Sequence, residues 1–388
     1  MVDALQQALQ GEGIAMRMRV LGVMVWCAAV AGAQQAEQDK RVHVNEIQVI
    51  GSHNSYHAGF APSERKWMEA HSPKALHSLD YKHAPLGDQL TGGVRQLEID
   101  VFADAKGGRF AHPMITRGVA KDGLPADLEL DPNHELDAPG FKVMHVQDLD
   151  ERSVCHTFVI CLTQVKAWSK AHPGHLPLFL LIETKEGALK EMPNAVTTEP
   201  FTKDVFDALD AEILSVFLKS EIVTPDEVRG SAATLNEAVT KRGWPTLAKT
   251  RGRVIFLMDQ RKVEGIYTDG HPSLKGRILF TNAVPGLPDA AFTEENDGSL
   301  ARIDGLVKQG YLVRTRTDEG TEAARTNDTT RRDLALRSGA QMISTDYPPS
   351  EPSQWTPYVV KFPGGLVGRC NPVNAPKGCD DSLLEPVR

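Results

Sequence analysis

Three kinds of segment are missing from this 388-residue sequence, and each absence excludes a class of protein. No block of basic residues stands out and the formal net charge is −8, so binding to nucleic acid is not expected. After the N-terminal region no apolar run is long enough to cross a bilayer, so we expect no transmembrane segment in the mature chain. There is also no internal repeat and no low-complexity tract. The composition is that of a globular protein with room for a substantial core.

The N-terminus has the pattern of an export signal. Two arginines precede an apolar run over residues 20–31, and small residues follow directly. The run is too short to span a membrane, and it is apolar all round, which disfavours an amphipathic helix. We therefore predict a signal peptide over residues 1–35, with residues 1–15 as an extension upstream of Met16. The protein is then secreted or periplasmic.

Cysteine is scarce, and its placement agrees with export. Cys27 falls within the predicted signal, which leaves two sequence-local pairs, Cys155 with Cys161 and Cys370 with Cys379. Three connectivities are possible for four cysteines, and we favour the two local bridges. Zinc binding is the competing explanation, but neither pair has the two-residue spacing of a zinc knuckle.

Eight apolar, strand-like segments occur along the chain, most of them separated by helical patterns and most ending in polar side chains. They cover residues 46–50, 94–101, 142–144, 176–182, 253–258, 277–280, 311–313 and 341–344. The uninterrupted apolar run before Glu183 is typical of a parallel strand that is buried on both faces. Eight such units predict an α/β fold, a (β/α)8 TIM barrel, as a single domain over residues 36–388. We expect the tail from Trp355 onward to be strapped to the barrel. A doubly wound open sheet is the alternative, but no glycine-rich phosphate turn follows the first strand.

Hard oxygen donors gather where the predicted strands end. Glu98 and Asp100 are two positions apart in one strand, so their carboxylates share a face, and Glu183 ends another strand. Neighbouring carboxylates repel each other unless a cation lies between them. Together with Asn54 after the first strand, these oxygen donors fit Ca²⁺ or Mg²⁺ better than zinc or copper.

Two histidines and two arginines lie at other strand ends. His53 follows the first strand and His145 the third, and both can serve as general acid or base. Arg314 and Arg316 end the seventh strand and share a face, where an arginine could hold a phosphate oxygen. Histidines, arginines and a cation together are suited to phosphodiester cleavage. Alternatively, His145 braces a loop and the arginines pair with acids at the surface. For Asp259, two interpretations are equally favoured: a helix N-cap and a site residue.

The last predicted strand adds groups suited to a sugar-like ring. Asp346 and Tyr347 end it, and a carboxylate and an aromatic ring can contact hydroxyls and an apolar ring face. Lys185, two residues after Glu183, completes the set of expected substrate-binding residues.

These motifs together resemble a known family. Residues 52–56 (Ser-His-Asn-Ser-Tyr), 97–100 (Leu-Glu-Ile-Asp), 144–145 (Met-His) and 182–183 (Ile-Glu) are similar to the catalytic barrel of phosphatidylinositol-specific phospholipases C. In particular the chain resembles the secreted, calcium-dependent members of this phosphodiesterase superfamily, over about residues 44–347. The resemblance implies Ca²⁺ held by Asn54, Glu98, Asp100 and Glu183, with His53 and His145 as the acid/base pair.

The resemblance also implies a reaction and a partner. The inositol 2-hydroxyl attacks the phosphorus, which releases diacylglycerol and an inositol (cyclic) phosphate, and which histidine is the base stays open. We expect a monomer that meets its phospholipid or phosphodiester substrate at a membrane surface. Plain or glycosylated phosphatidylinositol is favoured, since no lysines match those that hold ring phosphates in signalling relatives. The alternatives are a glycerophosphodiester phosphodiesterase, which usually has His-Arg-Gly where this chain has residues 53–55 (His-Asn-Ser), and a non-catalytic lipid- or sugar-binding barrel.

Overall fold

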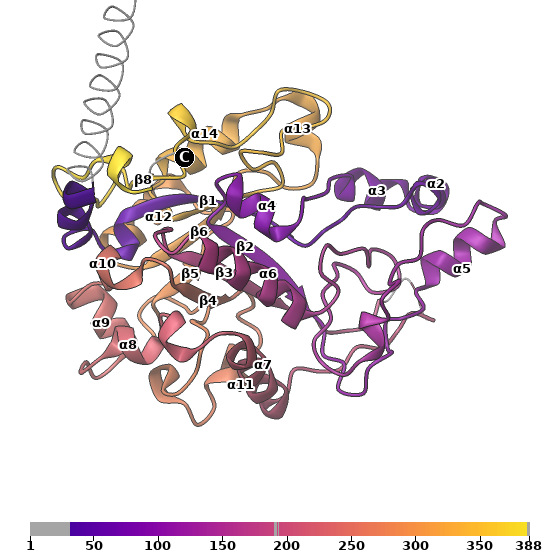
Figure 1. Ribbon diagram of the computed structural model, residues 1–388, viewed down its shortest axis with the longest axis horizontal. Helices are drawn as coiled ribbons and strands as arrows, with labels where there is room; N and C mark the ends of the chain where they lie inside the picture. The colour runs from indigo at the N-terminus through magenta and orange to yellow at the C-terminus, as the bar shows by residue number, and fades with distance from the viewer. Residues whose placement is uncertain (1–31, 190–191, 193, 386–388) are drawn as a thin grey trace, which may run out of the picture.

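The computed structural model describes residues 32–189, 192 and 194–385, and these form an α/β barrel (Figure 1). Seven parallel strands lie in the order β4-β3-β2-β1-β7-β6-β5, and β8 pairs antiparallel with the first half of β1. The strands are β1 (Ile47–Ser52), β2 (Gln96–Val101), β3 (Leu178–Thr184), β4 (Val254–Met258), β5 (Phe292–Glu294), β6 (Leu312–Arg316), β7 (Met342–Thr345) and β8 (Gly368–Cys370). The predicted signal peptide lies, up to residue 31, outside the described residues.

The gap between the two outermost parallel strands is bridged by one short segment. Phe280 forms a parallel bridge with Leu257 of β4, and Asn282 forms one with Phe292 of β5. The parallel sheet is therefore nearly closed, and the predicted TIM-barrel type of fold is confirmed. Six of the predicted strands overlap β1, β2, β3, β4, β6 and β7.

One predicted strand is wrong. Residues 142–144 form only single bridges, from Lys142 to Phe102 and to Thr157, and they join no strand of the barrel. Met144 is buried with Phe102 in a small cluster of its own, beside the barrel. Val143 is buried in the main core, so the apolar pattern of these residues reflects burial and not membership of the sheet.

The sixth predicted strand is also displaced. Residues 277–280 contribute only the bridge at Phe280, and the next parallel strand is β5, which was not predicted. β5 has three residues and follows a loop with two prolines and a glycine, so its period-2 pattern is too short to recognise.

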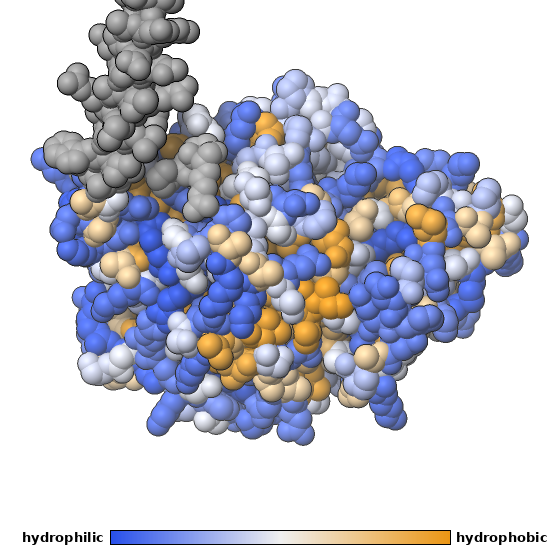
Figure 2. Space-filling model, viewed as in Figure 1, coloured by the Kyte–Doolittle hydropathy of each residue, from blue (hydrophilic) through white to orange (hydrophobic). Residues whose placement is uncertain are grey.

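Helices cover the outside of the sheet. α6 (Phe158–Ala171) and α7 (Lys203–Val216) each begin after a threonine whose hydroxyl accepts a backbone N–H of the first turn, a stabilising N-cap. Over the region where α6 and α7 lie, apolar residues gather at the centre of this face, and mostly polar residues surround them (Figure 2). The other helices are α2 (Pro62–His71), α3 (Pro73–Leu79), α4 (Leu86–Thr91), α5 (Met114–Lys121), α8 (Pro225–Arg229), α9 (Leu235–Lys241), α10 (Leu247–Thr250), α11 (Glu264–Thr268), α12 (Leu300–Lys308), α13 (Glu322–Thr326) and α14 (Thr330–Arg337).

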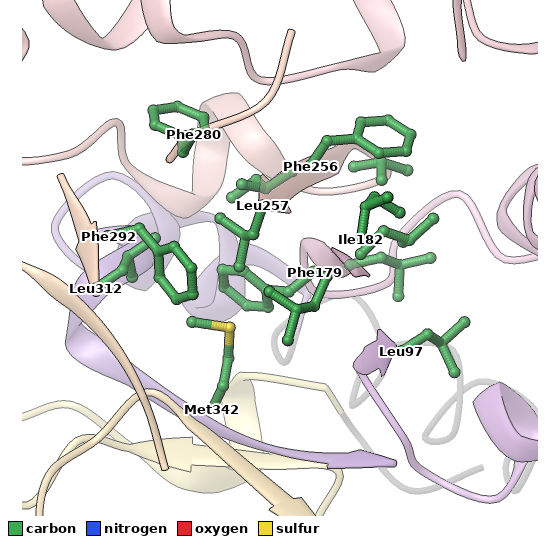
Figure 3. Packing of buried hydrophobic residues seen from close by; sticks show 14 of the residues in the cluster. Leu97, Phe179, Ile182, Phe256, Leu257, Phe280, Phe292, Leu312 and Met342 are labelled. Atoms are coloured by element: carbon green, nitrogen blue, oxygen red, sulfur yellow. The ribbon is translucent and has the colours of Figure 1, made fainter. Parts of the chain in front are cut away.

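The core has an inner and an outer part. Figure 3 shows Phe179, Phe292 and Met342 pointing toward one another in the barrel interior, and all three are fully buried. Leu97 and Ile182 point the other way, toward the surrounding helices. Strands buried on both faces account for the uninterrupted apolar runs in the sequence.

Two long insertions stand beyond the end of β2, where α2, α3 and α5 lie together (Figure 1). The first spans residues 53–95, and the second, residues 102–157, is here called the excursion. They share a small apolar cluster of Met68, Leu76 and Ile115. This places both insertions at the carboxyl ends of the strands.

Both predicted disulfides are present. Cys155–Cys161 joins the end of the excursion to α6, and Cys370–Cys379 closes the tail just after β8. The pairing of β8 with β1 confirms that the C-terminal segment is strapped to the barrel. Among the described residues, none of the helices combines the length and the apolar character that a membrane crossing requires.

Candidate active site

Three carboxylates meet at the ends of two neighbouring strands. Glu98 and Asp100 of β2 and Glu183 of β3 each offer an oxygen, and these oxygens lie within 4.8 Å of one another. Asp100 and Glu183 are direct partners in the parallel register. Burial, and then the charge of Glu183, raise the pKa of Asp100 well above its usual range. Both carboxylate oxygens of Asp100 are buried, and in the described residues neither meets the angular criteria of a hydrogen bond, although the Lys185 ammonium forms an ion pair with Oδ2.

Two basic side chains of the protein already neutralise part of this charge. The ammonium of Lys185 lies 3.0 Å from Asp100 Oδ2 and 3.1 Å from Glu183 Oε1. Arg314 pairs with Glu98, and only 2% of its side chain is exposed. Both were predicted to bind substrate. The structure places the Lys185 ammonium against Asp100 and Glu183 and the Arg314 side chain inside the barrel, and their contact with substrate stays a prediction.

Two more carboxylates belong to the cluster. Asp259 follows β4, and no helix begins there, since α11 starts only at Glu264; this excludes the N-cap interpretation. Burial, and then the charge of Glu183, raise its pKa. Glu294 ends β5, 3.6 Å from the Arg314 guanidinium. Sequence reasoning missed Glu294 because it missed β5.

Asn54 is placed beside these carboxylates by a strained backbone turn. Its φ is 46°, in the left-handed region that asparagine tolerates better than most residues. The side-chain N–H of Asn54 donates to the Tyr81 hydroxyl at 2.8 Å, and its Oδ1 accepts from the Tyr56 hydroxyl at 3.3 Å. Burial and then the charge of Asp100 raise the pKa of Tyr56, which shows that this hydroxyl is near the cluster. The three carboxylates thus carry excess negative charge, which suits calcium, and Asn54 is linked to them through the Tyr56 hydroxyl.

The His53 imidazole lies between an acidic side chain, Asp346, and a basic side chain, Arg316. Its Nδ1 lies 2.7 Å from Asp346 Oδ1, and its Nε2 lies 3.1 Å from Arg316 Nη1 and 3.5 Å from Glu98 Oε1. Burial, followed by the charge of Arg316, lowers the pKa of His53 well below its usual value. His53 is therefore neutral, and because Arg316 donates to Nε2, the proton of the ring is on Nδ1, facing Asp346. Asp346 was predicted to contact substrate hydroxyls, and this stays a prediction; in the structure its buried carboxylate accepts from His53.

His145 approaches the site from the excursion, where its Nδ1 lies 3.0 Å from Asp150 Oδ2. Its side chain is 19% exposed. Burial lowers the pKa of His145, although the adjacent Asp150 acts in the opposite direction. The charge of His145 also contributes to lowering the pKa of His53, so the two imidazoles are near each other. Sequence reasoning missed Asp150, because the apolar pattern of residues 142–144 predicts a strand and does not predict the tight turn that follows.

A cavity of about 690 Å³ opens beside Asp346. Asp346 and Tyr347 line it from the end of β7, and Tyr81 and His83 line it from the first insertion. The buried Tyr347 hydroxyl has no hydrogen-bond partner in the described part of the chain. The Tyr347 hydroxyl is therefore available to form a hydrogen bond with a molecule bound in this cavity, as predicted for a substrate-binding residue.

A barrel with a carboxylate cluster and two histidines at its strand ends has the equipment of a metal-assisted phosphodiesterase. Residues 42–372 match the family described as phosphoinositide phospholipase C, Ca²⁺-dependent, and the chain belongs to that family. Its members are enzymes, and the predicted family is thereby confirmed. None of the curated protein sequences compared with this chain matches it.

Solved structures of a Pseudomonas phospholipase, with TM-scores above 0.5, share the fold of this chain. A calcium-dependent phosphoinositol-specific phospholipase C from a Gram-negative bacterium, Pseudomonas sp., is 15% identical, with a TM-score of 0.53 over 86% of this chain and 96% of that chain. Its myoinositol complex gives 16% identity and a TM-score of 0.52 over the same shares. A Ca²⁺-dependent phosphatidylinositol-specific phospholipase C from Streptomyces antibioticus is 19% identical, with a TM-score of 0.47 over 79% of this chain and 95% of that chain.

Proposed function

We propose that the protein is a calcium-dependent enzyme that cleaves the headgroup phosphodiester of phosphatidylinositol-type lipids. The observation that carries the proposal is the convergence of Glu98, Asp100 and Glu183, within 4.8 Å, in a chain of this family. Asn54 would complete the ligand set. A bound Ca²⁺ would supply a positive charge that stabilises the phosphorane-like transition state and favours ionisation of the attacking hydroxyl.

His53 is suited to the role of general base. Its Nδ1–H donates to Asp346, and its Nε2 accepts from Arg316, so Nε2 carries a lone pair. With its pKa lowered by burial and then by Arg316, the ring is neutral at neutral pH and can take a proton at Nε2. The proton removed is that of the inositol 2-hydroxyl, whose oxygen then attacks the phosphorus.

His145 is suited to the role of general acid. To act as the acid it must be the imidazolium, in which Nδ1–H donates to Asp150 and Nε2 carries the second proton, the one given to the glycerol oxygen that leaves. Arg316, whose side chain is 11% exposed, is the arginine able to contact a phosphate oxygen. The products are diacylglycerol and an inositol cyclic phosphate, which water can open in a second step.

The protein meets this substrate at a membrane surface after export. Two disulfides and the apolar N-terminal segment support a secreted or periplasmic location. We also propose that it acts as a monomer.

An activity panel tests this function. Phosphatidylinositol in mixed micelles and glycerophosphocholine are each offered with Ca²⁺ or with a chelator. We expect turnover of phosphatidylinositol only, and only with Ca²⁺. Turnover of glycerophosphocholine alone would show a glycerophosphodiesterase, and calcium-dependent thermal stabilisation without turnover of either would show a binding protein.

A further inference from the structure

His57 is a buried histidine that the proposed mechanism leaves unused. Its side chain is fully buried, and its Nε2 lies 2.9 Å from Asp150 Oδ1. The other oxygen of that carboxylate, Oδ2, lies 3.0 Å from Nδ1 of His145. One carboxylate therefore joins a wholly buried imidazole to the imidazole of the site, and the two ring centroids are 6.1 Å apart.

A tight turn brings Asp150 back to His145. The backbone N–H groups of His145 and Val146 each donate to the Asp150 carbonyl at 3.1 Å, and the Asp150 N–H donates to the Val146 carbonyl at 2.8 Å. Asp148 within the turn has a φ of 67°, and its carboxylate accepts the Met114 N–H at 2.8 Å. Backbone hydrogen bonds thus place the carboxylate against the histidine five residues earlier.

His57 in turn belongs to the loop that follows β1, which also carries His53 and Asn54. Its N–H donates to the Asn54 carbonyl at 2.8 Å, and its carbonyl accepts the His83 N–H at 2.8 Å. It also forms an antiparallel bridge with Ser153, just beyond the turn of His145. His57 is therefore fixed to the barrel side of the site while it bonds to the excursion side.

This link matters because no strand of the barrel holds His145. We propose that Asp150 and His57 are positioning residues, which fix the His145 ring against the barrel and direct its Nε2 toward the substrate. The inference rests on the proposed function, in which His145 protonates the leaving oxygen. Because the Nδ1–H of His145 is bound to Asp150, only Nε2 remains to exchange a proton with substrate.

Because Asp150 contacts both His57 and His145, its carboxylate raises the pKa of His145 less than an unshared carboxylate would. Burial alone would raise the pKa of Asp150, but the two imidazoles hold it well below its usual range, so the carboxylate stays ionised. Three effects act on the pKa of His145. Burial lowers it, the hydrogen bond and charge of Asp150 raise it, and the charges of Lys185 and His57 lower it. His53 and Asp346 also interact electrostatically with His145. The arrangement orients His145 without making it strongly basic.

The Asp150→Asn variant tests the proposal, since it keeps the shape of the side chain. An amide can accept from one imidazole but must donate to the other, so one of the two rings has to change tautomer. We expect the ¹⁵N signals of His145 to shift from the Nδ1–H tautomer to a mixture. We also expect kcat on phosphatidylinositol to fall roughly 10²–10³-fold, with KM and the calcium Kd changed by less than about threefold.

The His57→Gln variant tests the buried half of the link. Glutamine can still donate to Asp150 but is not held like the ring, and we expect a smaller loss of kcat, about tenfold. Combined with Asp150→Asn, it should add nothing, because both act through His145. Thermal melts and calcium binding verify that each variant is folded.

Glu135→Gln is the matched control. It changes another histidine–carboxylate pair of the excursion, in which Glu135 lies 3.5 Å from His156, and we expect wild-type kcat. The proposal is overturned if Asp150→Asn keeps both kcat and the His145 tautomer, or if the two losses multiply in the double variant. If the wild-type protein does not cleave phosphatidylinositol, the proposed function is wrong. The tautomer of His145 in Asp150→Asn then decides by itself whether Asp150 positions the His145 ring.

Discussion

The two histidines of the candidate site are held in different ways. His53 and Asp346 follow β1 and β7, which are neighbouring parallel strands, so the hydrogen bonds of the sheet alone bring imidazole and carboxylate to 2.7 Å. His145 and Asp150 come from a turn in the excursion, which adds no strand to the barrel. One pair is set by sheet register, the other by a local turn and by contacts between side chains.

This difference indicates how substitutions at the two pairs, His53 with Asp346 and His145 with Asp150, should affect the protein. His53 and Asp346 directly follow paired strands of the barrel, so substitutions there should change chemistry more than folding. The pair with His145 depends on a few buried polar contacts, each costly to leave unpaired. Changes there should affect both position and local stability, and the predictions below separate the two.

The largest effect is expected from removing either imidazole. His53→Ala and His145→Ala should each lower kcat by roughly 10³–10⁴-fold, because each removes a proton-transfer step. The measurement is single-turnover cleavage of phosphatidylinositol, with calcium affinity as the control that the carboxylate cluster is intact. If either variant keeps activity within a factor of ten, that histidine is not in the reaction.

The two arginines of β6 should separate catalysis from stability. Arg316→Ala should cost about 2–4 kcal/mol of transition-state stabilisation, seen as lower kcat/KM, because Arg316 faces the site. Arg314→Ala should instead cost about 3–5 kcal/mol of unfolding free energy, because it leaves Glu98 buried without its partner. Urea denaturation checks the second value. The opposite assignment of the two effects would show that Arg314 contacts substrate.

Glu151, directly after the turn of His145, is a buried carboxyl group whose ionisation destabilises the fold. Burial raises the pKa of Glu151 from 4.5 to about 8, and its Oε2 has no partner in the described chain. A raised folded-state pKa favours the fold below pH 4.5, and this contribution is lost as the pH rises toward 8. Glu151→Gln should therefore gain about 4 kcal/mol in unfolding free energy at pH 7.5 and nothing at pH 4. Equal effects at both pH values would contradict this reason.

The smallest effect concerns calcium binding. The Lys185 ammonium lies on two of the proposed ligands, Asp100 and Glu183, so a cation must displace it. Lys185→Met should tighten calcium binding by about tenfold, since it removes a competing charge at short range. Isothermal titration calorimetry measures it, and Lys262→Met, near Glu186 at the surface, is the control expected to change nothing. Weaker binding in Lys185→Met would mean that the lysine supports the bound ion.

Much of the carboxylate cluster could be predicted from sequence, because it depends on local spacing. The two-residue separation of Glu98 and Asp100 places both on one face of a strand wherever that strand lies. Glu183 follows an apolar run long enough to identify as a strand without its neighbours. Asp150 and Glu294 were out of reach, because one follows residues that only imitate a strand and the other ends a strand of three residues.

The sequence by itself determined the barrel, the local disulfides and the chemistry of most side chains at the strand ends, since these follow from periodicity and near neighbours. Only the tertiary structure decided what each charged side chain contacts. It placed Asp346 behind His53, Arg314 on Glu98 and Lys185 on Asp100. The physical reason is that strand register and burial set which opposite charges meet across hundreds of residues, and no local pattern encodes that choice.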